Sequence, residues 1–120
     1  MRYMLLIYDE ETKLEKMSPS DRATMHQEYY DFIAGIQKDG AFLAGEPLER
    51  TNTATTVRAK SGKTITTDGP FAETKEQLGG YFIVEAKNLD EAMAIAARIP
   101  SVPRGGSVEV RPIREMDLPK

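Results

Sequence analysis

Residues 3–8, Y-M-L-L-I-Y, are apolar at every position, and residues 81–84, Y-F-I-V, form a second run of the same kind. Short apolar runs rich in aromatic and β-branched side chains are typical of strands. A half-exposed antiparallel strand alternates apolar and polar residues, whereas these two runs do not. We therefore expect both to be central strands of a sheet that is covered on both faces.

A long amphipathic helix is predicted after the first run. Ser18 suits the N-cap, Pro19 suits the first helical position, and Gly40 follows the end of the pattern as a left-handed stop. The helix should therefore span residues 19–38. Its apolar stripe is Met25, Tyr29, Phe32, Ile33 and Ile36.

A second helix is predicted after residues 81–84. Asn88 and Glu91 have the spacing of a capping box, and Pro100 ends the pattern. Its expected buried stripe is Leu89, Ala92, Met93 and Ala96.

The remaining segments are predicted to be shorter strands. Ala41–Leu48 is one, and the Thr-rich segments Thr53–Ala59 and Lys63–Thr67 form a probable hairpin through the turn between them. Val108–Arg111 is the last strand, and Pro112 suits a position at a sheet edge.

The order of these elements is strand, helix, strand, hairpin, strand, helix, strand. We predict one α+β domain over residues 1–120, with a ferredoxin-like βαββαβ order, an inserted β-hairpin, and two helices on one face of an antiparallel sheet. The two helices leave the second sheet face uncovered. The simplest cover is the same face of another copy, so we expect a homodimer through the sheet faces.

Composition narrows the classes of function. A net charge of -3 without a basic run argues against a nucleic-acid partner, and no segment is long enough to be a signal peptide or to span a membrane. We expect a soluble, cytoplasmic protein. With one histidine and no cysteine, no metal is expected, and no cofactor is implied.

Residues 67–81, T-D-G-P-F-A-E-T-K-E-Q-L-G-G-Y, place a turn, charged side chains and a glycine pair between two strands. One interpretation is structural. Asp68 accepts backbone hydrogen bonds in a turn, Phe71 enters the core, and residues 72–78 form a short helix that ends at Gly79.

The other interpretation is catalytic. Asp68 or His26 would move protons, since His26 is the one side chain whose ordinary pKa lies near neutrality. Glu46, Arg58, Glu73 and Lys75 would orient a small polar or anionic substrate in a cleft beside the Asp68 loop. The tyrosines are predicted mainly to pack in the core and at its rim.

The chain resembles the YciI-like (YCII-related) proteins, in the branch named after the D-G-P-F residues, Asp68–Phe71. The resemblance covers Thr67–Tyr81, Gly45–Leu48, Thr55–Arg58 and Gly106–Pro112. It implies a dimeric α+β barrel. It also implies a genetic context beside extracytoplasmic-function sigma factors.

Many YciI-like proteins pair a histidine on the first helix with an aspartate near the end of the second, and that pair is thought to be an active site. Here the two positions fall near Tyr29 and at Ile99, so we do not transfer the pair to this chain. Two hypotheses follow: an enzyme-like domain that binds a small molecule, or a non-catalytic ligand-binding or regulatory module associated with a sigma factor.

Overall fold

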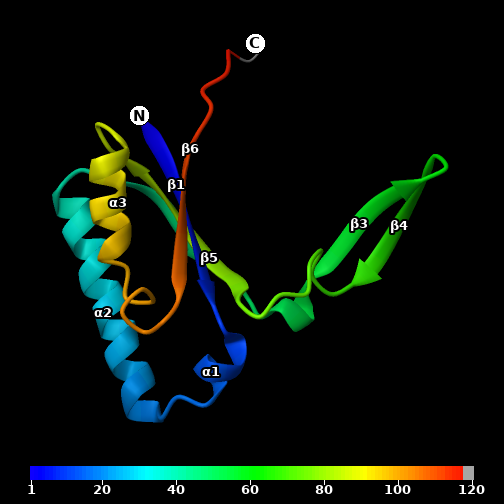
Figure 1. Ribbon diagram of the computed structural model, residues 1–120, viewed down its shortest axis with the longest axis horizontal. Helices are drawn as coiled ribbons and strands as arrows, with labels where there is room; N and C mark the ends of the chain where they lie inside the picture. Colours follow the sequence, from blue (N-terminus) through cyan, green and yellow to red (C-terminus); the bar gives the residue numbers. More distant parts are fainter. Residues whose placement is uncertain (118–120) are drawn as a thin grey trace.

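The computed structural model describes residues 1–117 and has the predicted α+β architecture (Figure 1). Its elements are β1 (Arg2–Asp9), α1 (Glu11–Glu15), α2 (Pro19–Lys38), β2 (Phe42–Pro47), the 3-10 helix η1 (Thr51–Thr53), β3 (Thr55–Lys60), β4 (Lys63–Asp68), β5 (Gln77–Glu85), α3 (Leu89–Ala97) and β6 (Ser107–Pro112). The four-stranded sheet has the order β2-β5-β1-β6, with antiparallel neighbours. This order confirms the ferredoxin-like prediction.

The two apolar runs form the central strands, as expected. β1 pairs with β5 on one side and with β6 on the other. Alternate side chains of these strands point toward the helices and are buried. They are Tyr3, Leu5 and Ile7 of β1 and Phe82 and Val84 of β5.

Helices α2 and α3 lie together on one face of the sheet (Figure 1). Both predicted caps are formed. The Asp21 amide donates to the Ser18 hydroxyl over 3.1 Å, and the Glu91 amide donates to the Asn88 side chain over 2.9 Å. These bonds satisfy amides that would otherwise lack a partner in the first helical turn. Within residues 1–117, no helix is long and apolar enough to cross a membrane.

The predicted apolar stripes are only partly buried. On α2, Phe32 and Ile36 are buried in the core, whereas Met25, Tyr29 and Ile33 are half-buried. The stripe predicted for α3 is wrong in part, because Leu89 and Met93 are each 46% exposed. The side of α3 that packs on the sheet instead carries Ala92, Ile95 and Ala96.

The segment that follows the D-G-P-F residues is not helical, which corrects the structural interpretation given above. Residues 71–76 are irregular, and β5 already begins at Gln77. Strand pairing prevents the predicted helix from reaching residue 78, because Gln77 and Leu78 pair with Asp9 and Tyr8 of β1. Phe71 does not enter the core either, since it is 75% exposed.

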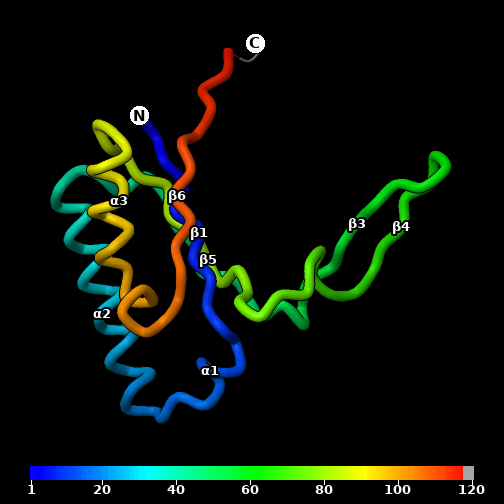
Figure 2. The backbone as a smooth tube through the Cα atoms, viewed as in Figure 1, coloured from blue at the N-terminus to red at the C-terminus, as the bar shows by residue number. Residues whose placement is uncertain are grey.

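The predicted hairpin forms a projection of its own. β3 and β4 pair as a separate two-stranded sheet, and we call residues 55–68 the arm. Figure 2 shows the arm extending away from the body, joined to it through the chain on either side of residues 55–68. All residues of the arm except Thr56 are exposed.

The sheet face opposite the helices carries a second set of apolar side chains. Met4 pairs with Ile83, and Leu6 pairs with Tyr81, on the two central strands. These four side chains are only half-buried, since no element of residues 1–117 packs over them. We call this surface the open face.

Candidate functional site

A cavity of about 410 Å³ lies beside α2, at the end of the sheet where β1 finishes and β5 starts. Its apolar lining includes Ile7, Ile33 and Phe82. Its polar lining includes Asp9, His26, Tyr29, Glu46 and Arg50. The volume and the mixture of an apolar wall with a few polar groups are typical of small-molecule sites.

A chain of three hydrogen-bonded side chains borders this cavity. The Tyr29 hydroxyl lies 2.6 Å from the Ser101 hydroxyl, and Ser101 donates to Oδ2 of Asp9 over 2.8 Å. Ser101 is 2% exposed, so the middle member of the chain is withdrawn from water. Tyr29 and Asp9 both line the cavity.

Three separate parts of the fold deliver these side chains. Asp9 is the last residue of β1 and faces the helices, two residues after buried Ile7. Tyr29 lies midway along α2. Ser101 lies in the turn after α3, where its carbonyl accepts hydrogen bonds from the Arg104 and Gly106 amides at 3.1 and 2.8 Å. That turn fixes the Ser101 backbone between the other two.

Gly106 leaves the space that Asp9 occupies. A Cβ at position 106 would overlap Oδ1 of Asp9 and would lie 2.9 Å from the Tyr8 carbonyl oxygen. Gly80 is similarly constrained, because a Cβ there would lie 2.9 Å from the Glu46 carbonyl oxygen. These glycines are required for close approach of chain segments at the site.

A β-bulge shapes the same end of the sheet. Ile7 pairs with Gly80 and Tyr8 pairs with Leu78, so Gly79 is an extra residue in β5. Its carbonyl accepts a hydrogen bond from the Leu48 amide at 2.9 Å, which anchors the end of β2. Gly79, Gly80 and Leu48 all line the cavity. Bulges commonly redirect the chain next to active sites.

The surroundings of Tyr29 keep its hydroxyl protonated. Burial raises the pKa of Tyr29 above its ordinary value, the hydrogen bond with Ser101 opposes this rise, and the nearby Asp9 carboxylate adds to it. Ser101 has a single hydroxyl proton and donates it to Asp9, so its oxygen accepts the proton of Tyr29. The Tyr29 oxygen therefore retains lone pairs for a group in the cavity.

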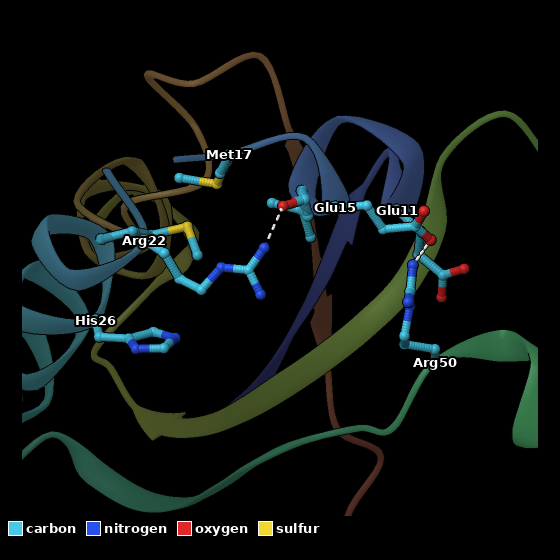
Figure 3. Close-up of a pocket in the computed structure, with 8 residues that line it drawn as sticks. Glu11, Glu15, Met17, Arg22, His26 and Arg50 are labelled. Carbon is cyan, nitrogen blue, oxygen red and sulfur yellow. Dashed lines mark hydrogen bonds and ion pairs between the residues drawn. The ribbon is translucent and has the colours of Figure 1, made fainter. Parts of the chain in front are cut away.

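A second cavity of about 520 Å³ adjoins the first, with His26 and Arg50 among the residues that line both. It lies between α1 and the first turns of α2. Figure 3 shows the Arg22 guanidinium reaching from α2 toward α1, where it donates to the Leu14 carbonyl over 2.9 Å. Arg50 forms an ion pair with Glu15 of α1.

Helix α1, which the sequence did not predict, closes this end of the molecule. The Glu11 carboxylate accepts hydrogen bonds from the Thr51 amide at 2.9 Å and from the Thr51 hydroxyl at 2.8 Å. The Glu11 amide donates to the Gln77 side chain over 2.9 Å. A five-residue helix is too short to be stable alone, so these tethers hold it in place.

Comparison with known proteins bears on this architecture. The model of the YCII-related domain matches residues 1–117. The chain belongs to the YCII-related family. It is also 34% identical over 114 residues to an uncharacterised protein of Rhizobium meliloti (strain 1021), a match that covers 94% of this chain and 92% of that protein. Neither match names a reaction.

In this YCII-related chain, the structure divides the predicted site residues into separate groups. His26 and Glu46 line the cavity of 410 Å³. Arg58 and Asp68 lie on the arm, and neither they nor Phe71 lines that cavity. The exposed side chain of Asp68 makes no hydrogen bond to any other residue within 1–117.

The two remaining predicted residues lie between the arm and β5. Glu73 and Lys75 are both exposed, and the Lys75 ammonium lies 3.6 Å from the Glu10 carboxylate. Thus the structure brings two of the six predicted residues to one cavity, and the other four lie in the arm or in the segment between the arm and β5. Within residues 1–117, no group of three His, Cys, Asp or Glu side chains is arranged to hold a metal ion.

Sequence reasoning did not select Asp9 or Ser101. Asp9 is a carboxylate directly after an apolar strand, which is a usable local signal. Ser101 follows Pro100 in a turn, and nothing in that stretch indicates burial. The sequence predicts a packing role for Tyr29, whereas its hydroxyl reaches a polar partner 72 residues away in the chain.

Proposed function

We propose that this YCII-related protein is an enzyme-like domain that binds a small molecule in the cavity of 410 Å³ and exchanges a proton with it. The observation that carries the proposal is the Tyr29, Ser101 and Asp9 chain, which runs from the cavity wall to a carboxylate through a buried hydroxyl. A polar chain beside a cavity, whose middle hydroxyl is buried and hydrogen-bonded on both sides, suits general acid–base chemistry.

The proposed step is a proton relay. A ligand O–H or N–H donates to the Tyr29 oxygen, and its proton passes to that oxygen as the Tyr29 proton moves to Ser101. The Ser101 proton moves at the same time to Oδ2 of Asp9. The ligand loses one proton and Asp9 becomes a neutral carboxylic acid, so atoms and charge balance. The reverse transfer returns the proton to the product.

The cavity lining favours a particular class of ligand. The acidic side chains of Asp9, Glu46 and Glu49 line it, whereas Arg50 is the one lysine or arginine among the lining residues. Arg50 is already paired with Glu15. A neutral or cationic polar molecule with an apolar part therefore fits better than a simple anion, which would meet a repulsive field. His26 at the junction with the second cavity would contact the same molecule.

We also propose the homodimer predicted from the sequence. Met4, Leu6, Tyr81 and Ile83 give the open face an apolar centre, and two such faces packed together would remove these side chains from water. The interface would be isologous, since each copy contributes the same surface. Tyr81 belongs to the open face and also lines the cavity, so this interface would border the cavity.

An NMR screen with fragment-sized alcohols and amines tests the proposed site. Hits should shift the amides of Tyr29, Glu46 and Gly80, which line the cavity from three elements. Binding should persist in Asp9→Asn, because the Tyr29 hydroxyl remains, while turnover of any hit that reacts should be lost. Hits that cluster away from these amides, or turnover that survives Asp9→Asn, would contradict the proposal.

A further inference from the structure

The arm has more exposed apolar surface than an isolated hairpin can support. A two-stranded hairpin is marginally stable in water unless it packs against something. Here Val57 is 63% exposed, Ile65 is 40% exposed, and Phe71 beside the arm is 75% exposed. The Arg58 guanidinium lies over the Phe71 ring but leaves most of this side chain exposed. The arm therefore has the properties of a surface that is completed by a partner.

The two faces of the arm differ in charge. Val57 is paired with Thr66, and Ala59 with Thr64, on a face that is uncharged over these pairs. The opposite face carries the pair of Arg58 with Ile65 and the pair of Lys60 with Lys63. Side chains alternate between faces along a strand, so this separation follows directly from the register.

The arm and the rest of the chain have opposite charges. Arg58, Lys60, Lys63 and Asp68 give the arm a charge of +2, and the whole chain carries -3, so the remaining residues carry -5. The body of a second copy is thus attractive to the arm. A generic acidic partner would be attractive as well, but a second copy is present wherever the arm is.

Phe71 is held in its exposed position by the local backbone. Gly69 adopts a φ of 103°, which other residues rarely adopt, and its amide donates to the Ala54 carbonyl over 2.7 Å. The Thr56 hydroxyl donates to the Gly69 carbonyl over 2.8 Å. The Arg58 guanidinium lies 5.1 Å from the centre of the Phe71 ring. The D-G-P-F segment thus fixes an aromatic side chain at the base of the arm.

The direction of the arm identifies where a second copy would meet it. Figure 1 shows the arm projecting from the body on the side of the sheet away from α2 and α3, which is the side of the open face. A copy that docks its open face here lies alongside the arm. By symmetry, its own arm lies alongside the first copy.

We propose that the arm of each copy clasps the body of a second copy, with Phe71 and Ile65 as its apolar anchors and with Lys60 and Lys63, on the same face as Ile65, toward the acidic body. The proposal rests on the open-face homodimer proposed above. It assigns the D-G-P-F segment to subunit recognition, whereas the cavity carries the chemistry.

Sedimentation equilibrium of the full chain tests this assignment. Phe71→Ala should weaken dimerisation roughly tenfold or more, as expected for a buried aromatic anchor. Lys60→Glu/Lys63→Glu should weaken dimerisation further. The loss should be larger at low salt, because repulsion between the new glutamates and the acidic body is then less screened. Lys16→Glu/Lys38→Glu is the matched control, since it makes the same change in net charge at two exposed positions outside the arm, the C-cap of α1 and the last residue of α2.

The outcomes separate the two proposals. A wild-type monomer at micromolar concentration would overturn both the dimer and the clasp. A dimer whose dissociation constant is unchanged by Phe71→Ala and by the arm charge reversal would overturn the clasp alone. Equal weakening by the control pair would assign the effect to net charge and would also overturn it.

Cross-linking gives a second measurement that does not depend on the stability of a variant. A carbodiimide joins lysine ammonium groups to carboxylates in contact, and it is applied here to an equal mixture of isotopically labelled and unlabelled protein. Lys60 or Lys63 should link to body carboxylates in peptides of mixed isotope content. Links found only within one isotope would contradict the clasp.

Discussion

The hydroxyl oxygens of Tyr29 and Ser101 lie 2.6 Å apart, although 72 residues separate them in the chain. The contact joins the middle of α2 to the turn that follows α3. Because Ser101 also donates to Asp9 at the end of β1, one serine connects three elements. The same contacts border the cavity, so stability and ligand binding are measurable through the same side chains.

Tyr29→Phe removes the first hydroxyl of the relay and leaves the ring in place. The loss of one hydrogen bond to a buried partner should lower the free energy of unfolding by about 1 kcal/mol. Tyr30→Phe is the control, since Tyr30 is 70% exposed and its effect should stay within about 0.5 kcal/mol. Urea denaturation measures both. Equal effects of the two substitutions would show that the Tyr29 hydroxyl contributes nothing specific.

Ser101→Ala should cost more, by about 1–3 kcal/mol, because it leaves both the Tyr29 hydroxyl and the Asp9 carboxylate without their shared partner. Ser107→Ala, at an exposed serine of β6, should change stability little. A double-mutant cycle with Tyr29→Phe should give a coupling energy above about 0.5 kcal/mol. Additive effects would mean that the three side chains do not act as one chain.

Stability should fall at alkaline pH because of Tyr29. Burial raises its pKa in the folded protein above the ordinary value of 10.0. Below about pH 10 the Tyr29 hydroxyl is protonated in both the folded and the unfolded chain, so it contributes no pH dependence to the free energy of unfolding. Above that value the unfolded chain loses the proton first, and stability is lost as pH rises toward the folded pKa. Tyr29→Phe should show a shallower alkaline decline, and parallel declines would contradict the assignment.

Gly106→Ala should destabilise the protein by about 1–3 kcal/mol, as expected for overpacking at a close contact. The new Cβ would meet Oδ1 of Asp9 and two backbone carbonyl oxygens, those of Tyr8 and Ser101, at 2.9 and 3.0 Å. Gly79→Ala is the matched control, because the nearest atom to its Cβ lies 4.0 Å away. Thermal denaturation compares them. A larger loss of stability in Gly79→Ala than in Gly106→Ala would contradict this prediction.

Ile83→Lys should convert the proposed dimer to a monomer. Ile83 lies at the centre of the open face, paired with Met4 of β1 and with Ala44 of β2. A lysine there would place a charge within the interface, whose desolvation opposes association. Met93→Lys places the same charge on the exposed side of α3 and should leave the dimer intact. Light scattering distinguishes the two states.

Much of the fold followed from local patterns. The limits of α2 agree with the cap at Ser18 and the stop at Gly40, and the fully apolar runs correctly indicated the two central strands. These predictions worked because caps, turns and strand patterns are local or periodic properties. The hairpin was found for the same reason, through its Thr-rich strands and its turn at Ser61-Gly62.

The errors came where distant partners decide the structure. Residues 72–78 contain good helix formers, yet pairing of Gln77 and Leu78 with β1 draws them into a strand. Asp9 and Ser101 are 92 positions apart in the chain, and no local pattern specifies their contact. The structural interpretation of the D-G-P-F segment predicts Phe71 in the core, whereas its place is set by a left-handed glycine and by the base of the arm.

The unequal burial of α2 divides the helix into two kinds of position. Phe32 and Ile36 are enclosed by the core, so substitutions there mainly lower the free energy of unfolding. Met25 and Ile33 border the cavity, so changes there alter its shape at a smaller cost. One helix can thus diversify what the protein binds over evolutionary time while its buried positions preserve the scaffold. Paralogues that differ at positions 25 and 33 are expected to select different molecules with the same relay.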